Sequence, residues 1–162
     1  MALDMFLDIT GVPGESIDKK HKGHISLLAW SWGTSQSGTT HDGPGGGAGK
    51  VNVQDLSFTK HIDSTSHLLL LNCCNGKHIP KAVLTIRKAG GDAPVDYLVL
   101  TLEEILVSSV STGGSGGEDR LTENVTINFA KATWTYTPQD SKGAAGTKVG
   151  PLGWNIAENV KV

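Results

Sequence analysis

The sequence predicts a mainly β protein, a small closed barrel or sandwich of short strands with one helix. Segments rich in Val, Ile and Thr alternate apolar with polar residues along most of the 162-residue chain, which is typical of half-buried strands. One run, Leu68–Cys74, has the character of a helix instead. The most distinctive stretch, Val107–Phe129, joins two β-type segments through glycine and serine. Such small residues allow another backbone to approach closely.

The first part of the chain predicts two strands. Residues 3–9 alternate apolar side chains with Asp4 and Asp8, and the pattern stops at Gly11. Residues 25–36 carry apolar or small side chains on both faces, so we expect one continuous strand that is covered on both sides. The core of the domain would cover one face, and a neighbouring subunit or an enclosed surface would cover the other.

A glycine-rich loop is expected over residues 38–49, followed by a strand over 51–60. Loops of this length without structure of their own are usually functional or mobile. Its glycines permit backbone conformations that other residues cannot adopt, so the loop is suited to projecting and docking on a partner.

The single helix should begin at Asp63 or Ser64 as the N-cap and end at Gly76. Because four consecutive leucines, residues 68–71, cover more than one stripe of a helix, we expect it to be buried over a broad face.

Four strands are expected after the helix. They cover residues 82–87, 95–112 with a bulge near 102–106, 121–137, and 152–156. In the third of these, apolar residues move from odd positions up to Phe129 to even positions from Trp134 onward. We therefore expect a bulge or bend near residues 130–132.

Composition excludes several classes of protein. A net charge of −2 argues against a nucleic-acid footprint. No apolar run approaches the ~20 residues of a membrane-spanning helix, and the acidic N-terminal segment lacks the basic region of a signal peptide. We expect one domain over residues 1–162, made in the cytoplasm and leaving the cell, if at all, without a cleaved signal.

No residue pattern indicates a catalytic, cofactor or metal site. The run Gly45–Lys50 has the glycines of a phosphate loop, but Pro44 and Val51 stand where that motif needs Gly and Ser or Thr. The adjacent Cys73 and Cys74 are expected to be free thiols, since paired zinc ligands are ordinarily separated by two or more residues.

Two further features have alternative interpretations. The triplet Glu118, Asp119 and Arg120 follows a glycine turn, which favours an inter-strand or inter-subunit ion pair over acid–base chemistry. The four tryptophans suit core packing but also a sugar-stacking platform, so a stand-alone carbohydrate-binding β module is the alternative function. They are Trp30, Trp32, Trp134 and Trp154.

Several blocks of the chain closely resemble Hcp, the haemolysin-coregulated tube protein of type VI secretion. These are Trp30-Ser-Trp-Gly, Ser35-Gln-Ser-Gly, Gly45–Lys60, Cys74-Asn-Gly-Lys-His, Arg87-Lys-Ala-Gly-Gly, Val107–Phe129 and Gly153-Trp-Asn-Ile. The resemblance implies a small β-barrel of two antiparallel sheets with one flanking α-helix. It also implies a homohexameric ring, and rings that stack into a phage-tail-like tube.

The resemblance further implies a carrier function. The tube would be expelled by a surrounding sheath, tipped by a spike protein, and would carry small effector proteins in its lumen. The chain would then be a secreted virulence protein with no enzymatic activity, no cofactor and no membrane insertion.

Positions for the expected contacts follow from alternation and loop chemistry. Ser31 and Ala29 are expected to face the lumen, because each lies between larger apolar residues of the 25–36 strand. A ring requires head-to-tail interfaces, so each subunit must present two different surfaces. For ring stacking or subunit contact we expect the glycine loop, the charged turn and the polar face of the 121–137 strand. The residues are Gly45, Gly46, Gly47, Glu118, Asp119, Arg120, Thr126 and Asn128.

Overall fold

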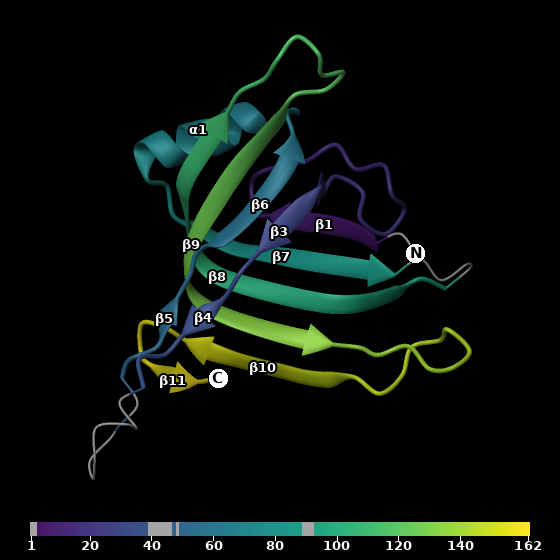
Figure 1. Ribbon diagram of the computed structural model, residues 1–162, viewed down its shortest axis with the longest axis vertical. Helices are drawn as coiled ribbons and strands as arrows, with labels where there is room; N and C mark the ends of the chain where they lie inside the picture. The colour runs from purple at the N-terminus through teal and green to yellow at the C-terminus, as the bar shows by residue number, and fades with distance from the viewer. Residues whose placement is uncertain (1–2, 39–46, 48, 89–92) are drawn as a thin grey trace.

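The computed structural model describes residues 3–38, 47, 49–88 and 93–162, and its secondary structure is mainly β, as the sequence predicts (Figure 1). In that part of the chain, nine strands form one antiparallel sheet and two form a separate hairpin. The larger sheet contains β1 (Leu3–Ile9), β2 (Ile25–Ser26), β3 (Ala29–Ser31), β6 (Leu56–His61), β7 (Ile79–Lys88), β8 (Val95–Thr112), β9 (Thr122–Tyr136), β10 (Val149–Asn155) and β11 (Val160–Lys161). The hairpin consists of β4 (Thr34–Ser35) and β5 (Asn52–Val53).

The sheet is strongly curved but open, so the predicted closed barrel of two sheets is wrong. Its strand order is β11-β10-β9-β8-β7-β1-β2, and β6 branches from β9 to pair with β3. The chain between β2 and β3 comes close to closing the circuit. Leu27 N donates to Met5 O in β1, and Leu28 N donates to Thr59 O in β6. Within the described ranges, these single bonds alone join the two sides, and no continuous ladder closes the sheet.

This crossover also divides the strand expected over residues 25–36 into β2, β3 and β4. Leu27 is buried whereas Leu28 is 46 % exposed, and Trp30 then packs against the core. Because Leu27 and Leu28 bond to different strands, the alternation of buried and exposed side chains shifts by one position. The uniform two-faced strand of the prediction is therefore replaced by three short pieces with different neighbours.

β9 shows the predicted change of phase, and its cause is a change of neighbour. From Thr122 to Ile127 the strand pairs with β6, and from Lys131 to Tyr136 it pairs with β10. Burial falls on odd positions up to Phe129 and then moves to Ala132. Pairing with β8 keeps one register through this bend, and the register shift of that pair lies between Val107 and Ser109.

The core lies inside the curve of the sheet. It combines side chains from β1, β2, β6, β7, β8 and β9 with one leucine of the helix. Its largest members, all essentially inaccessible to solvent, are Leu7, Ile9, Ile25, Leu56, Phe58, Leu69, Leu84, Leu100, Leu102, Ile105 and Ile127.

The helix α1 (Ser66–Asn75) ends as predicted at Gly76, whose φ of 62° is in the left-handed region that favours glycine. Its start differs from the prediction, because Thr65 rather than Asp63 or Ser64 occupies the N-cap position. The broad burial expected of the leucines is also wrong. Leu69 is buried, but Leu70 and Leu71 are 52 % and 54 % exposed, because only one side of α1 lies against β8.

Candidate functional site

The strands β3, β6 and β9 form a surface of small uncharged polar side chains, here called the polar face. Antiparallel pairing aligns Ala29 with Thr59 and Asn124 in one row across the three strands. The next row aligns Ser31 with Ser57 and Thr126. The intervening row of Trp30, Phe58 and Val125 points the other way, into the core. The six residues of the two outer rows line a shallow depression of about 380 Å³.

Hydrogen bonds fix the side chains of the polar face. Thr59 Oγ1 lies 2.7 Å from Asn124 Oδ1, and the threonine hydroxyl donates. At one end of the face Asp55 accepts from Asn128 Nδ2 at 2.9 Å and from Ser108 Oγ at 2.7 Å. The hydroxyls of Ser108 and Thr126 are also 2.7 Å apart. The surface is thus polar and preorganised, with one carboxylate at its edge.

The structure brings some of the predicted contact residues together and separates others. Ala29, Ser31, Thr126 and Asn128 lie on or beside the polar face. Gly45 and Gly46 fall outside the described residues, and Gly47 is exposed beyond the β4–β5 hairpin.

The charged turn is far from that hairpin along the sheet. Glu118, Asp119 and Arg120 are exposed at the tip of the β8–β9 connection, which stands at the top of Figure 1, whereas β4 and β5 lie at the lower left. Among the described residues no ion pair involves these three side chains.

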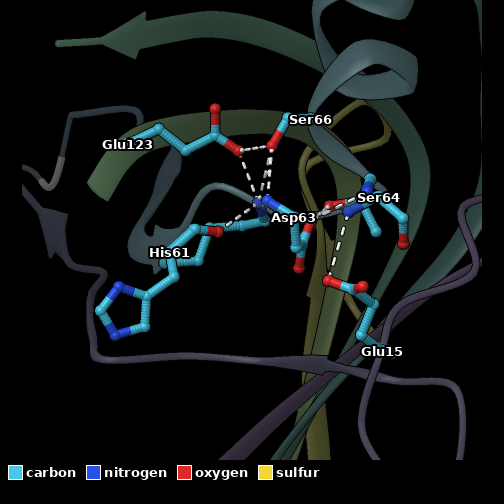
Figure 2. Close-up of polar contacts among 8 residues, drawn as sticks. Glu15, His61, Asp63, Ser64, Ser66 and Glu123 are labelled. Carbon is cyan, nitrogen blue, oxygen red and sulfur yellow. Dashed lines mark hydrogen bonds and ion pairs between the residues drawn. The ribbon is translucent and has the colours of Figure 1, made fainter. Parts of the chain in front are cut away.

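A buried ionic cluster, here called the Lys60 cluster, attaches α1 to β6 and β9 (Figure 2). Lys60 Nζ lies 2.5 Å from Glu123 Oε1 and 2.9 Å from Asp63 Oδ1, and it also donates to the carbonyl oxygen of His61. Ser66, the first residue of α1, donates to the same Glu123 oxygen at 2.7 Å. The side chains of Lys60 and Glu123 are fully buried.

The carboxylate of Asp63 is the more accessible acceptor of the Lys60 cluster. Partial burial opposes its ionisation, but hydrogen bonds from Thr65 and Lys60 outweigh that effect and hold the pKa of Asp63 below its usual value. Outside the cluster, Glu15 accepts a hydrogen bond from Ser64 N at 3.3 Å and so attaches the loop before β2 to the start of α1 (Figure 2).

A second ionic group, the Arg87 cluster, fastens the loop between β1 and β2. Arg87 donates from both terminal nitrogens to the two oxygens of Asp18, at 3.0 and 2.5 Å, and from Nη2 to Asp4 at 3.0 Å. Its guanidinium also lies 5.0 Å from the centre of the Phe6 ring. The bidentate contact with Arg87 lowers the pKa of Asp18, and the same contact raises the pKa of Arg87.

His21 completes the attachment of this loop. Its ring stacks on Phe6 with centroids 4.4 Å apart, and its Nδ1 lies 3.3 Å from Nδ1 of His24. Burial lowers the pKa of His21, although Asp96, 3.8 Å from Nε2, acts in the opposite direction.

The tryptophans form a pocket rather than an exposed platform. Trp32, Trp134 and Trp154 line a cavity of about 370 Å³ between the β4–β5 hairpin and the β10–β11 turn. The indole of Trp32 donates to Gln54 O at 3.0 Å and meets the Trp134 ring edge to face, with centroids 5.8 Å apart. Trp30 packs on the core. The sequence indicated these residues without revealing that three of them share one cavity.

Within the described ranges, no group of three or more His, Cys, Asp or Glu side chains is arranged to hold a metal ion. No helix there is long and apolar enough to cross a membrane.

Comparison with known proteins gives concordant matches. The family model described as "Type VI secretion system effector, Hcp" matches residues 6–136. The curated protein "Protein hcp1" of Pseudomonas aeruginosa is 62 % identical over 161 residues, which cover 99 % of each chain.

Solved structures agree over nearly the whole length. One titled "Structure of a type six secretion system protein" has a TM-score of 0.94 at 34 % identity and covers 99 % of this chain and 100 % of its own. A crystal structure of Hcp1 from Salmonella typhimurium has a TM-score of 0.80 at 37 % identity, with both chains fully covered.

Proposed function

The chain belongs to the Hcp family and is a tube protein of the type VI secretion system, and from this premise we propose that six copies form a ring and that rings stack into the tube. Residues 1–162 act as one tube domain. The observation that carries the proposal is the polar face, a preorganised sheet surface without a lysine or arginine on its two outer rows.

We assign the polar face to the lumen of the ring. Ala29, Ser31, Ser57 and Thr126 are small and uncharged, and side chains of this kind leave a wide, weakly adhesive channel. A cargo protein would be retained there by many weak polar contacts and released when the ring opens. Asn128 and Asp55, at the end of the face, would lie where the surface meets a neighbouring copy.

The contacts between rings are assigned to the glycine loop with Gly45, Gly46 and Gly47, and to the turn with Glu118, Asp119 and Arg120. The β4–β5 hairpin and the β8–β9 connection lie at different ends of the molecule in Figure 1, which supports a head-to-tail arrangement, in which one end of a copy meets the other end of the next. Sheath proteins would surround the tube, and a spike protein would cap it.

Secretion would follow expulsion of the assembled tube from the cytoplasm, without a cleaved signal peptide. We assign no catalytic reaction to the chain, and its cargo is small effector proteins.

Light scattering of the purified protein tests the assembly. The expected particle has six times the 17.0 kDa mass of the chain. A monomer at micromolar concentration would refute the ring.

A bulky side chain placed on the polar face tests whether this face lines the lumen. Ser57→Phe adds a ring at the centre of the row that contains Ser31 and Thr126. We expect intact rings that no longer retain a co-expressed effector protein, measured by co-purification. The matched control is Lys142→Phe in the exposed turn between β9 and β10, which should retain the effector. Equal retention by both variants would place the cargo elsewhere.

A further inference from the structure

Ile17 is the most exposed large apolar side chain in the described part of the chain. It is 96 % exposed, whereas the next such residue, Val149, is 60 % exposed. A single exposed apolar residue on a loop without fixed contacts would need no explanation. The loop that carries Ile17, however, is held by hydrogen bonds.

Both neighbours of Ile17 are held in place. Ser16 N donates to His24 O at 3.0 Å, and Ser16 O accepts from Gly23 N at 2.8 Å. Asp18 on the other side accepts two hydrogen bonds from Arg87 and two more from the backbone of its own turn. Ile17 is therefore presented in a fixed position, so docking it would cost little conformational entropy.

The same chain contains an apolar cavity of suitable size at its opposite end. The pocket of about 370 Å³ is lined by Trp32, Trp134 and Trp154 together with Val51, Val53 and Ile156, and its polar members are Thr34, Gln36 and Asn159. None of the described residues that line it is acidic or basic. Its aromatic wall is preformed, since the Trp32 indole is fixed by Gln54 and by the Trp134 ring. An uncharged aliphatic side chain fits this lining.

The Ile17 side chain and the tryptophan-lined cavity cannot meet within one chain. Ile17 borders a depression shared with His61 and Arg120, next to Thr122 at the start of β9. The cavity contains Trp134, twelve positions further along the same strand, which is roughly 40 Å of extended chain. In Figure 1 the β4–β5 hairpin lies at the lower left and the start of β9 at the top.

We propose that Ile17 of one copy docks into the Trp32–Trp134–Trp154 cavity of the next copy, as an apolar anchor of a head-to-tail contact. When a protruding side chain and its complementary cavity lie at different places on the same chain, the contact between copies is heterologous and repeats from copy to copy. The inference rests on the proposed assembly and names one of its contacts. It also explains why a buried arginine and a stacked histidine are used to hold a surface loop.

Disulfide trapping tests the contact directly. In a Cys73→Ser/Cys74→Ser background, Ile17→Cys combined with Asn159→Cys at the rim of the cavity should give covalent oligomers on oxidation. The matched control pairs Ile17→Cys with Lys142→Cys, a comparably exposed site outside the cavity, and should stay monomeric on a denaturing gel. A ladder that stops at six places the contact within a ring, and a longer ladder places it between rings.

Substitution gives a second readout. Ile17→Ser should weaken association between copies by about tenfold to a hundredfold, the effect of exposing one buried aliphatic side chain. The thermal unfolding of the dissociated monomer, measured at a concentration below that of assembly, should be unchanged, because the side chain touches solvent in the isolated chain. If wild-type rings form while the cysteine pair gives no cross-link and Ile17→Ser assembles normally, the docking inference is wrong and the ring proposal stands. If the wild type itself is monomeric, the ring proposal fails.

Discussion

The Lys60 cluster and the Arg87 cluster share one arrangement of charges but have different surroundings. Each places one cation between two carboxylates at hydrogen-bonding distance. Lys60 and Glu123 are completely buried, whereas Asp18 and Asp4 keep side-chain exposures of 24 % and 47 %. The Lys60–Glu123 pair is isolated from water, whereas both carboxylates of the Arg87 cluster are partly solvated.

Because of this difference, the Lys60 cluster contributes to the stability of the fold, whereas the Arg87 cluster fixes the loop that presents Ile17. A charge that loses its partner in a dry interior has no alternative solvation, so the Lys60 cluster is needed for the helix and sheet to remain docked. A carboxylate that loses its partner at the surface is solvated by water, so the Arg87 cluster contributes less to folding. Its effect is local, since it holds the residues on either side of Ile17.

The largest effect is expected from Lys60→Met. This change leaves Glu123 buried without its cation, and we expect the free energy of unfolding to fall by about 3–5 kcal/mol. Urea denaturation followed by tryptophan fluorescence measures it. The double variant Lys60→Met/Glu123→Leu removes both charges and should recover most of the loss. A single-variant loss below about 1 kcal/mol would contradict the contrast between the clusters.

Arg87→Met should act on the β1–β2 loop more than on the whole fold. The apolar stem is retained against Phe6, while Asp18 and Asp4 turn to water. We expect backbone amides of the loop to exchange with solvent about tenfold faster, with little change in the midpoint of urea unfolding. Hydrogen exchange read by mass spectrometry compares the loop with β8 as an internal reference. Equal acceleration in both regions would show that the cluster supports the whole sheet.

Lowering the pH should reduce the protection of the β1–β2 loop from hydrogen exchange before it reduces that of the sheet. The pKa of His21 is lowered by burial in the folded state, so the unfolded chain binds the proton first, near pH 6.5. Stability from His21 is therefore complete above that pH and falls as the pH drops toward the folded-state pKa. The charges that face this ring are Asp96, Asp18, Arg87 and His24.

At lower pH Asp18 contributes in the same direction. Its pKa is lowered in the folded state, so its contribution is present above its ordinary value and is lost only as the pH falls well below it. Protection factors of the loop amides, which are the intrinsic exchange rates at each pH divided by the observed rates, isolate the histidine between pH 8 and pH 5. His21→Phe keeps the stacked ring on Phe6 and should make the protection factors independent of pH over that interval. A slope that persists in His21→Phe would assign the pH response to another group.

The Lys60 cluster shows how much the alternation of a strand reveals. Glu123 has the same parity as Val125 and Ile127, and Lys60 has that of Leu56 and Phe58, so both charges fall on core-facing positions. Two opposite charges at core-facing positions of neighbouring strands indicate an ion pair. Only the register, which aligns Lys60 with Glu123, identifies the partners.

The Arg87 cluster has no comparable signal. Asp18 lies on a loop without periodicity and meets Arg87, 69 residues away, through the path of the chain. The open sheet and the division of residues 25–36 were missed for a related reason. Hydropathy shows that Leu27 and Trp30 are both apolar, but not that Leu27 bonds to β1 whereas Leu28 and Ala29 pair with β6.

The smallest effect is expected on the polar face, which has no buried charge to lose. Thr59→Val removes the hydrogen bond to Asn124 while keeping the branched shape that suits β6. Because both partners are accessible to water, the free energy of unfolding should change by no more than about 0.5 kcal/mol. Urea denaturation of Thr59→Val beside Lys60→Met, its neighbour in β6, measures the contrast within one strand. A cost approaching that of Lys60→Met would mean that the face supports the fold and is not a surface reserved for contacts.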